Sequence, residues 1–205
     1  MMEVAVLGHR GMLGSVVARH FAMRGATVWT TEGRYDGSDA VPSWAARFDL
    51  TINCIRSDDW REMVDLPAHL ALVTRLIQPS TDAIHEDTPY AQMKREAERV
   101  SAIIIRSGII DVEHQPATAY ASWKCNPLTP LEWARVAWRL RRAKPGIYQF
   151  GRESTDRAYL ARLVARFWDR PDPQIAQGIP NDRVLASPWT FPSLDVALAE
   201  YRKWL

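Results

Sequence analysis

A glycine-rich stretch near the N-terminus, Gly8–Gly14, leaves few folds open to this chain. It follows the apolar run Val4–Leu7 and contains three glycines spaced three residues apart. The residues after it are apolar at helical spacing as far as Gly25, and a β-type run follows over residues 26–30. This order predicts a strand, a glycine turn, a helix and a second strand.

The predicted turn has the chemistry of a phosphate-binding site. Without side chains the backbone can approach a pyrophosphate closely, and the following helix directs its free N–H groups and the positive end of its dipole toward the same place. We therefore predict a dinucleotide-binding unit, although the bare motif also fits a flexible surface turn. The residues expected at the cofactor are Gly8, His9, Arg10, Gly11, Met12, Leu13 and Gly14.

The three-residue spacing of these glycines resembles the short-chain dehydrogenase/reductase superfamily. Within it, Gly8–Ser15 is similar to the opening of the extended sugar-nucleotide branch, which includes dTDP-4-dehydrorhamnose reductases, GDP-fucose synthases and NAD-dependent epimerase/dehydratases. The resemblance implies a Rossmann-like α/β fold with a doubly wound, mostly parallel sheet and a reduced C-terminal substrate lobe. We expect a single compact domain, in which residues 1–110 form mainly the dinucleotide-binding core and residues 111–205 mainly the lobe.

The turn-rich residues after the second strand bear on the choice between cofactors. An acidic side chain such as Glu32 suits the ribose 2′-hydroxyl of NAD, whereas a guanidinium such as that of Arg34 suits the 2′-phosphate of NADP. Arg10 adds a second guanidinium, and in the resembling synthases this pattern accompanies NADP. We predict NADP as the cofactor and keep NAD as the alternative.

Further positions resemble the family's cofactor site. Asn53–Cys54 is similar to its Asn-Cys-Ala-Ala at the end of the fourth strand, which implies that Asn53, Cys54 and Ile55 lie beneath the adenosine half. Ile55 and Arg56 replace small alanines, so a bulkier wall is expected there. Ser107, after a buried-type strand, would lie near the nicotinamide.

Ser80–Asp82 resembles the strand-end Ser-Thr-Asp of the dehydrorhamnose reductases. In that family the threonine hydroxyl helps to hold the substrate carbonyl, so the resemblance gives this catalytic role to Thr81 and places Asp82 near the substrate. Trp123, in the turn-rich segment 111–129, is a further candidate for substrate contact, because binding residues concentrate in such segments.

Tyr90 and Lys94 are the predicted catalytic pair. They lie four residues apart on a helix that Pro89 starts and that Asp87 or Thr88 caps, so they share one face. A free phenol has a pKa of about 10 and needs an adjacent cation to exchange a proton near neutral pH. Lys94 would supply that charge and hold the cofactor ribose. The resemblance to the family's active-site helix implies that Tyr90 is the proton donor.

Tyr120 and Lys124 have the same spacing and form a competing pair. Pro127 and Pro130 follow them closely and argue against a helix, whereas proline-free residues of good helical character follow Lys94. The context therefore favours Tyr90 over Tyr120.

Composition excludes several classes of protein. With 47% hydrophobic and 24% charged residues, a chain of 205 residues is typical of a globular protein. The formal charge of +2 does not favour binding to nucleic acid or to an anionic membrane, and no apolar run has the length of a membrane span. The two cysteines, Cys54 and Cys125, have neither a disulfide-framework nor a metal-ligand spacing. We expect a cytoplasmic protein that holds no metal.

Together these features predict an NADP-dependent reductase, or epimerase-reductase, of a nucleotide-linked keto-sugar. Epimerisation and dehydration stay open, because the same three residues serve all these reactions. Tyr90 comes only nine residues after Thr81, where the family has a longer loop that covers the substrate. A non-catalytic dinucleotide-binding sensor or interaction protein of the same fold is therefore the alternative. The expected partner is a nucleotide-sugar, and a homodimer is left open.

Overall fold

The computed structural model describes residues 1–30, 44–112 and 117–205. The described residues form two compact units. The first unit comprises Met1–Arg106 and Trp133–Tyr148, and the second comprises Ser107–Glu132 and Gln149–Leu205. The chain therefore leaves the first unit, returns to it, and ends in the second.

A six-stranded sheet forms the centre of the first unit. Its strands are β1 (Glu3–Leu7), β2 (Thr27–Thr30), β3 (Leu50–Asn53), β4 (Leu76–Ser80), β5 (Ile103–Arg106) and β8 (Gly146–Gln149). They lie in the order β2-β1-β3-β4-β5-β8, and β1 pairs in parallel with both β2 and β3. β4 pairs in parallel with β3 and β5. The mostly parallel, Rossmann-like sheet expected from the sequence is thus confirmed.

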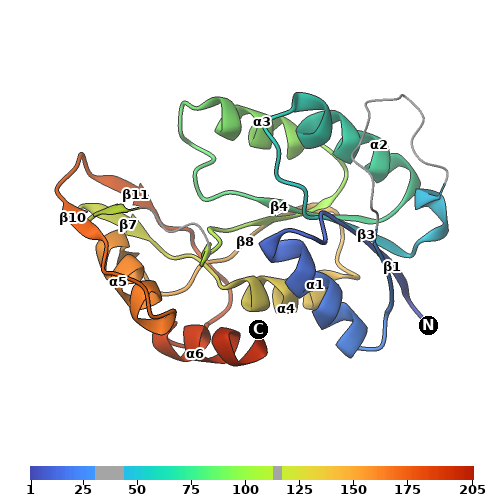
Figure 1. Cartoon of the computed structure of the whole chain (residues 1–205). Coiled ribbons are helices and arrows are strands. Elements are labelled where there is room, and N and C mark those ends of the chain that lie inside the picture. The colour runs from blue at the N-terminus through green and yellow to red at the C-terminus, as the bar shows by residue number, and fades with distance from the viewer. Residues whose placement is uncertain (31–43, 113–116) are drawn as a thin grey trace. The chain divides into compact units, whose positions relative to one another are not determined.

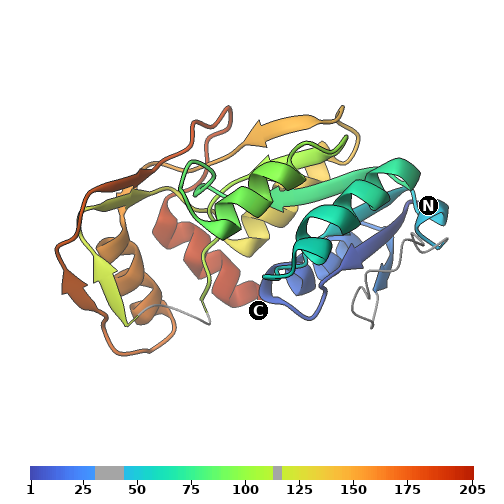
Figure 2. The same cartoon turned by 90° about the horizontal axis from the view of Figure 1, so that it is seen from above.

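Helices cover both faces of this sheet. They are α1 (Met12–Met23), η1 (Ala45–Arg47), η2 (Arg61–Asp65), α2 (Leu66–Val73), α3 (Pro89–Ala97) and α4 (Pro130–Leu140). Of these, η1 is a short 3-10 helix and η2 is a π-helical turn that leads into α2. Figure 1 shows α2 and α3 on one face and α1 and α4 on the other. The view from above shows α2 and α3 side by side (Figure 2), which completes a three-layer arrangement.

The inner strands of the sheet are buried in the core. Val4, Val6 and Ile52 are completely buried, as expected of parallel strands that helices cover on both faces. Phe21 of α1 is also buried and meets the ring of Trp138 in α4 edge-on, with ring centroids 5.1 Å apart. This contact joins the two helices of one layer.

The strand order of the sheet reverses at β1. The chain passes from β1 to β2 on one side of β1 and then to β3 on the other side. Sheets of this kind bind ligands beyond the carboxyl ends of their strands, at the point where the order reverses. Gly8 follows β1 at this point and Cys54 follows β3, and the Cys54 N–H donates to the carbonyl of Leu7 at 3.1 Å. This bond holds the two strand ends together.

The second unit contains small sheets and helices. Its elements are β6 (Thr118–Tyr120), β7 (Trp123–Cys125), β9 (Thr155–Asp156), α5 (Arg157–Phe167), β10 (Gln174–Ala176), β11 (Asn181–Arg183) and α6 (Leu194–Trp204). β10 pairs with β6, and β7 lies between β11 and β9. A buried ion pair joins Arg152 to Glu132, and Arg152 Nε also donates to the carbonyl of Pro127 at 2.8 Å. These bonds tie separate chain segments of the unit together.

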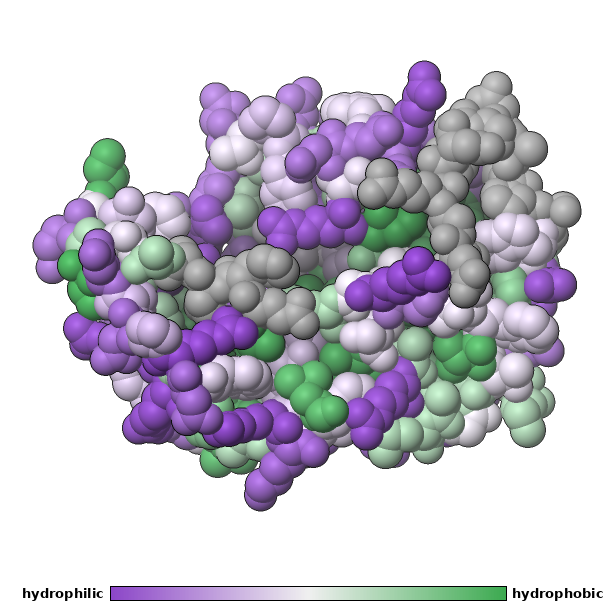
Figure 3. Space-filling view, viewed as in Figure 1, coloured by the Kyte–Doolittle hydropathy of each residue, from purple (hydrophilic) through white to green (hydrophobic). Residues whose placement is uncertain are grey.

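The sequence contains no apolar run long enough to span a membrane, and the structure allows the surface and the helices to be inspected directly. On the face shown in Figure 3, hydrophilic and hydrophobic residues are interspersed. None of the helices in the described ranges combines the length and the apolar character that crossing a bilayer requires.

His20 of α1 is an ionisable group in the core. It is 5% exposed, and its Nε2 has no hydrogen-bond partner among the described residues. Burial, and then the positive charges of Arg24 and Arg135, lower the pKa of His20 from its ordinary 6.5 to about 4. The folded protein therefore holds a neutral imidazole, whereas the unfolded chain takes up a proton there as the pH falls below 6.5.

The fold should consequently lose stability as the pH falls from 6.5 toward 4, and His20→Leu should reduce this loss. Through this group the parent should lose roughly 2–3 kcal/mol at pH 4.5 relative to pH 7.5, which urea unfolding at both pH values measures. His85→Leu, at an exposed histidine, is the matched control and should keep the pH dependence of the parent. An equal loss in the parent and in His20→Leu would contradict the neutral buried imidazole.

Candidate functional site

The glycine turn contains two glycines that the protein's own packing requires. Gly8 has a φ of +70°, in the left-handed region, and a Cβ there would lie 2.9 Å from the carbonyl carbon of Cys54. A Cβ on Gly14 would lie 2.2 Å from the Gly8 carbonyl oxygen. Only glycine therefore allows β1, the end of β3 and α1 to approach each other this closely.

Gly11 differs, because the described residues leave the space beside it open. Among them, a Cβ there would meet only the carbonyl oxygen of Gly8, at 3.4 Å. Gly11 is the N-cap of α1, no side chain of the described residues caps this helix, and its first turn carries no acidic residue. The N–H groups of the first turn are thus available to an anion. The turn therefore has the open backbone cradle that a cofactor phosphate needs.

The turn after β3 forms the neighbouring wall. Asn53 is buried, and its side-chain oxygen accepts a hydrogen bond from the Ile55 N–H at 3.3 Å. Burial raises the pKa of Cys54 to about 12, against the opposing effect of the Lys94 charge. Cys54 is therefore a neutral thiol, and this wall contributes shape rather than charge.

The helix α3 places Tyr90 and Lys94 on one face, as their spacing predicts. Thr88 is its cap, since the threonine hydroxyl accepts a hydrogen bond from the Ala91 N–H at 3.1 Å. Lys94 is 4% exposed, and its Nζ donates to the carbonyl of Pro79 at 3.1 Å. The same Nζ lies 5.7 Å from the centre of the Tyr90 ring. The capped helix and the shared face are confirmed, and the catalytic roles stay predictions.

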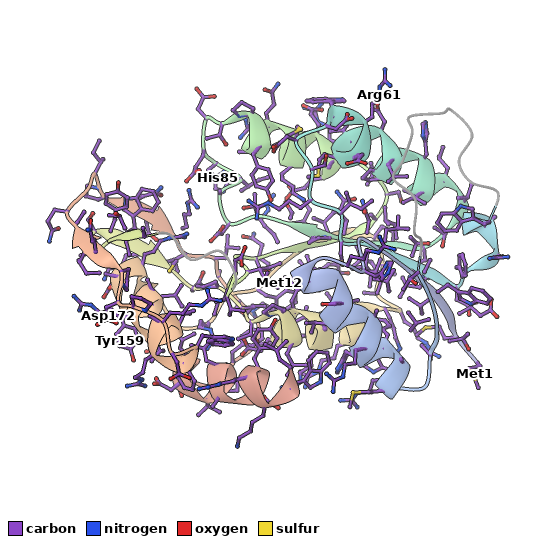
Figure 4. All side chains as sticks on the ribbon, viewed as in Figure 1. Met1, Met12, Arg61, His85, Tyr159 and Asp172 are labelled. Carbon is purple, nitrogen blue, oxygen red and sulfur yellow. The ribbon has the colours of Figure 1, made fainter. Side chains whose placement is uncertain are left out.

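Thr81 and Asp82 lie directly after β4. Thr81 is buried. Its hydroxyl accepts a hydrogen bond from the Ala83 N–H at 3.1 Å and donates one to the Asp82 carboxylate at 3.3 Å. Because the strands are parallel, this end of β4 and the glycine turn lie at the same edge of the sheet. Figure 4 labels one residue from each: His85, in the connection from β4 to α3, and Met12, at the start of α1.

Arg56 is a residue that the structure places beside Tyr90. Burial raises the pKa of Tyr90, and the nearby charges of Arg56 and Asp82 act in opposite directions, the first lowering and the second raising it. The Arg56 guanidinium lies 6.0 Å from the centre of the Tyr90 ring. From the sequence, Arg56 is only part of a bulky wall. The signal that points to it is a cation placed directly after a strand end that otherwise resembles a cofactor wall.

The remaining cofactor candidates of the first unit differ in exposure. Arg10 is exposed, His9 and Met12 are partly exposed, and Leu13 is buried. Arg34 lies outside the described residues, so its contact with a 2′-phosphate stays a prediction. Within the described ranges, no group of three or more His, Cys, Asp or Glu residues is placed to hold a metal ion.

Ser107 and Trp123 belong to the second unit. Ser107 is buried, and its hydroxyl has no hydrogen-bond partner in the described part of the chain. The Trp123 ring stacks on that of Tyr120 with centroids 4.9 Å apart, and its indole N–H donates to the carbonyl of Ile179 at 3.0 Å. Tyr120 and Lys124 lie on strands rather than on a helix, as the prolines after them predict.

Burial also governs the charge of Lys94. It lowers the pKa of Lys94 from 10.5 to about 8, with the charge of Arg56 reinforcing the change and that of Glu98 opposing it. A charged Lys94 therefore carries a folding cost that is fully present below pH 8 and disappears as the pH rises to 10.5.

Lys94→Met should therefore stabilise the fold at neutral pH. The burial cost is roughly 3 kcal/mol at pH 7, and the lost bond to Pro79 offsets about 1 kcal/mol of it, which leaves a net gain of about 2 kcal/mol. Urea unfolding should show this gain at pH 7 and almost none at pH 10. Lys124→Met, at an exposed lysine, is the control and should change stability little at either pH. A variant less stable than the parent at pH 7 would show that the bond to Pro79 outweighs the burial cost.

Several solved structures share this fold over nearly their whole length. One is dTDP-4-dehydrorhamnose reductase from Bacillus anthracis in complex with NADP, with a TM-score of 0.77 at 13% identity over 100% of this chain and 99% of that chain. A second is UDP-N-acetylglucosamine 4-epimerase from Bacillus cereus, with a TM-score of 0.73 at 12% identity. The match covers 100% of this chain and 99% of that chain. A third is a GDP-L-fucose synthetase from Naegleria fowleri bound to NADP, with a TM-score of 0.69 at 11% identity. The match covers 99% of this chain and 92% of that chain.

No protein-family model matches the sequence, and no curated protein matches it. At these low identities, the likeness to the solved structures concerns the fold. The three structures come from the branch that the motifs Gly8–Ser15, Ser80–Asp82 and Tyr90–Lys94 resemble. The Rossmann-like fold inferred from that resemblance is confirmed.

Proposed function

We propose that this chain is an NADP-dependent reductase, or epimerase-reductase, that acts on a nucleotide-linked keto-sugar. One observation carries the proposal: an open glycine turn and the Tyr90–Lys94 face of α3 belong to the same edge of one sheet. The turn suits a dinucleotide, and the face suits proton transfer. The solved structures bound to NADP add support, because they share the fold that brings these parts together.

The proposed cofactor site consists of the turn and its wall. The Gly11 N–H already donates to the carbonyl of Gly8 at 3.0 Å, so the backbone N–H groups of Met12–Gly14 would bind the pyrophosphate. Arg10 and Arg34 would pair with the 2′-phosphate. Asn53–Ile55 would lie beneath the adenosine half, and Lys94 would hold the ribose. When bound, NADPH supplies a hydride to the carbonyl carbon of the sugar.

Tyr90 would complete the reaction as the proton donor. Its O–H bond breaks as the carbonyl oxygen of the sugar takes the proton, and the proton and the hydride together convert the ketone into an alcohol. The Thr81 hydroxyl would hold the same oxygen, and Asp82, which Thr81 contacts, would lie near the sugar. Lys94 would favour the phenolate that Tyr90 leaves behind.

A second candidate is a non-catalytic dinucleotide-binding sensor or interaction protein. Two observations favour it: Tyr90 follows Thr81 by only nine positions, and burial raises the pKa of Tyr90. Epimerisation and dehydration are variants of the leading proposal, because they use the same three residues. A homodimer also stays a prediction.

Gly11→Val should abolish dinucleotide binding and leave the protein folded. The added side chain would enter the open space where the pyrophosphate is proposed to meet α1. Calorimetry should show tight NADPH binding by the parent and none by the variant. The parent should bind NADPH more tightly than NADH by at least tenfold, because each charge-assisted contact to the 2′-phosphate contributes roughly 1.5–3 kcal/mol.

Gly14→Ala is the contrasting variant for this experiment. Its Cβ would clash with the Gly8 carbonyl, so it should lower the unfolding midpoint itself. If Gly11→Val binds NADPH as the parent does, the turn is only structural. If NADH binds as well as NADPH, the preference for NADP is wrong.

Tyr90→Phe should lower turnover by roughly 10²- to 10⁴-fold, the usual contribution of a positioned acid or base. The change removes one oxygen and keeps the ring, so NADPH affinity should change little. NADPH oxidation with a panel of nucleotide 4-keto-sugars measures turnover, and calorimetry measures affinity.

Tyr120→Phe is the matched control, since it removes the same atom from the competing pair, and it should leave turnover within a few-fold of the parent. A silent Tyr90→Phe with a damaging Tyr120→Phe would reverse the assignment. If the parent binds NADP and turns over none of the sugars, the sensor becomes the better explanation.

A further inference from the structure

Arg56 brings a second cation to Tyr90 from a different part of the chain. It follows the wall residues after β3, whereas Tyr90 and Lys94 belong to α3. Its guanidinium carbon lies 6.0 Å from the centre of the Tyr90 ring, and the Lys94 Nζ lies 5.7 Å from the same centre. Both distances are within the reach of about 6 Å over which cations interact with aromatic rings. The proposed proton donor therefore has these two cations beside its ring.

The two cations differ in how firmly they keep their charge. Lys94 is buried and has a pKa of about 8, so its charge declines in the alkaline range. Arg56 is exposed, and guanidinium groups do not lose their proton in proteins. Above pH 8, Arg56 thus becomes the main positive charge at the ring.

Other influences at Tyr90 oppose its ionisation. Burial raises the pKa of Tyr90, and the Asp82 carboxylate acts in the same direction. Among the described residues, the charges at the ring therefore come from three places: Lys94 from α3, Asp82 from the connection after β4, and Arg56 from the turn after β3. Arg56 is the charge that offsets Asp82.

We propose that Arg56 is a positioning residue for Tyr90: its permanent charge, added to the Lys94 ammonium, favours the phenolate that forms when Tyr90 gives up its proton. This inference rests on the proposed role of Tyr90 as proton donor. The attraction between unit charges about 6 Å apart near solvent is modest, so the effect on turnover is about 3- to 10-fold.

The test compares Arg56→Met, which removes the charge, with Arg56→Lys, which keeps it. Arg61→Met is the matched control, since Arg61 is an exposed arginine of η2 whose side chain points away from the first unit (Figure 4). The first readout is the ultraviolet titration of the Tyr90 phenol. It is measured as the difference between each protein and the same protein carrying Tyr90→Phe, and it needs neither cofactor nor substrate.

Arg56→Met should shift the phenol titration to higher pH, Arg56→Lys should restore most of the parent's value, and Arg61→Met should match the parent. With a nucleotide 4-keto-sugar, Arg56→Met should lower kcat about 3- to 10-fold and leave KM within about twofold. The alkaline limb of its pH profile should move upward. The loss should be larger at pH 9 than at pH 7, because Lys94 is then mostly neutral.

An unchanged phenol titration in Arg56→Met overturns the proposal. A rise in KM alone also overturns it, since it assigns Arg56 to substrate contact, and so does a loss that Arg56→Lys does not recover. A shifted titration in a protein that reduces no keto-sugar supports the coupling of Arg56 to Tyr90 and counts against the proposed reaction instead.

Discussion

The backbone of the glycine turn and the end of β3 lie closer together than a residue with a side chain would allow. Gly8 turns the chain away from β1 with a positive φ, and α1 packs against the Gly8 carbonyl through Gly14. Because these contacts hold β1, β3 and α1 at one corner, the first N–H groups of α1 lie beside the turn without a side-chain cap from the described residues. The same contacts fix the direction in which the chain leaves β3. They therefore also help to place Arg56, whose guanidinium lies beside the Tyr90 ring.

Local sequence patterns predict the parts of the fold that depend on near neighbours. The glycine spacing and the apolar runs on either side of it predict β1, the turn and α1, and all three are present. The sequence around Pro89 predicts the start of α3 and offers two candidate caps, of which the structure selects Thr88. The shared face of Tyr90 and Lys94 follows from helical spacing alone.

Contacts between distant segments could not be predicted in this way. No spacing rule relates Arg56 to Tyr90, because they lie on different elements that meet only in the folded chain. The bond from Lys94 to Pro79 likewise depends on how α3 packs beside β4. The indole N–H of Trp123, a residue expected to contact a substrate, donates to a backbone carbonyl of its own unit. Such contacts depend on tertiary packing, which cannot be predicted from the periodicity of a single sequence.

The burial of Cys54, the cysteine beside the glycine turn, affects how readily its sulfur reacts. Its pKa of about 12 means that Cys54 forms hardly any thiolate in the physiological range. Peroxides, disulfides and alkylating agents react with the thiolate rather than the thiol. A cysteine beside a tight backbone turn is otherwise a point where oxidation can enlarge a side chain and fill the neighbouring space. Here burial keeps the Cys54 sulfur in its unreactive thiol form, so we expect this residue to react slowly with oxidants.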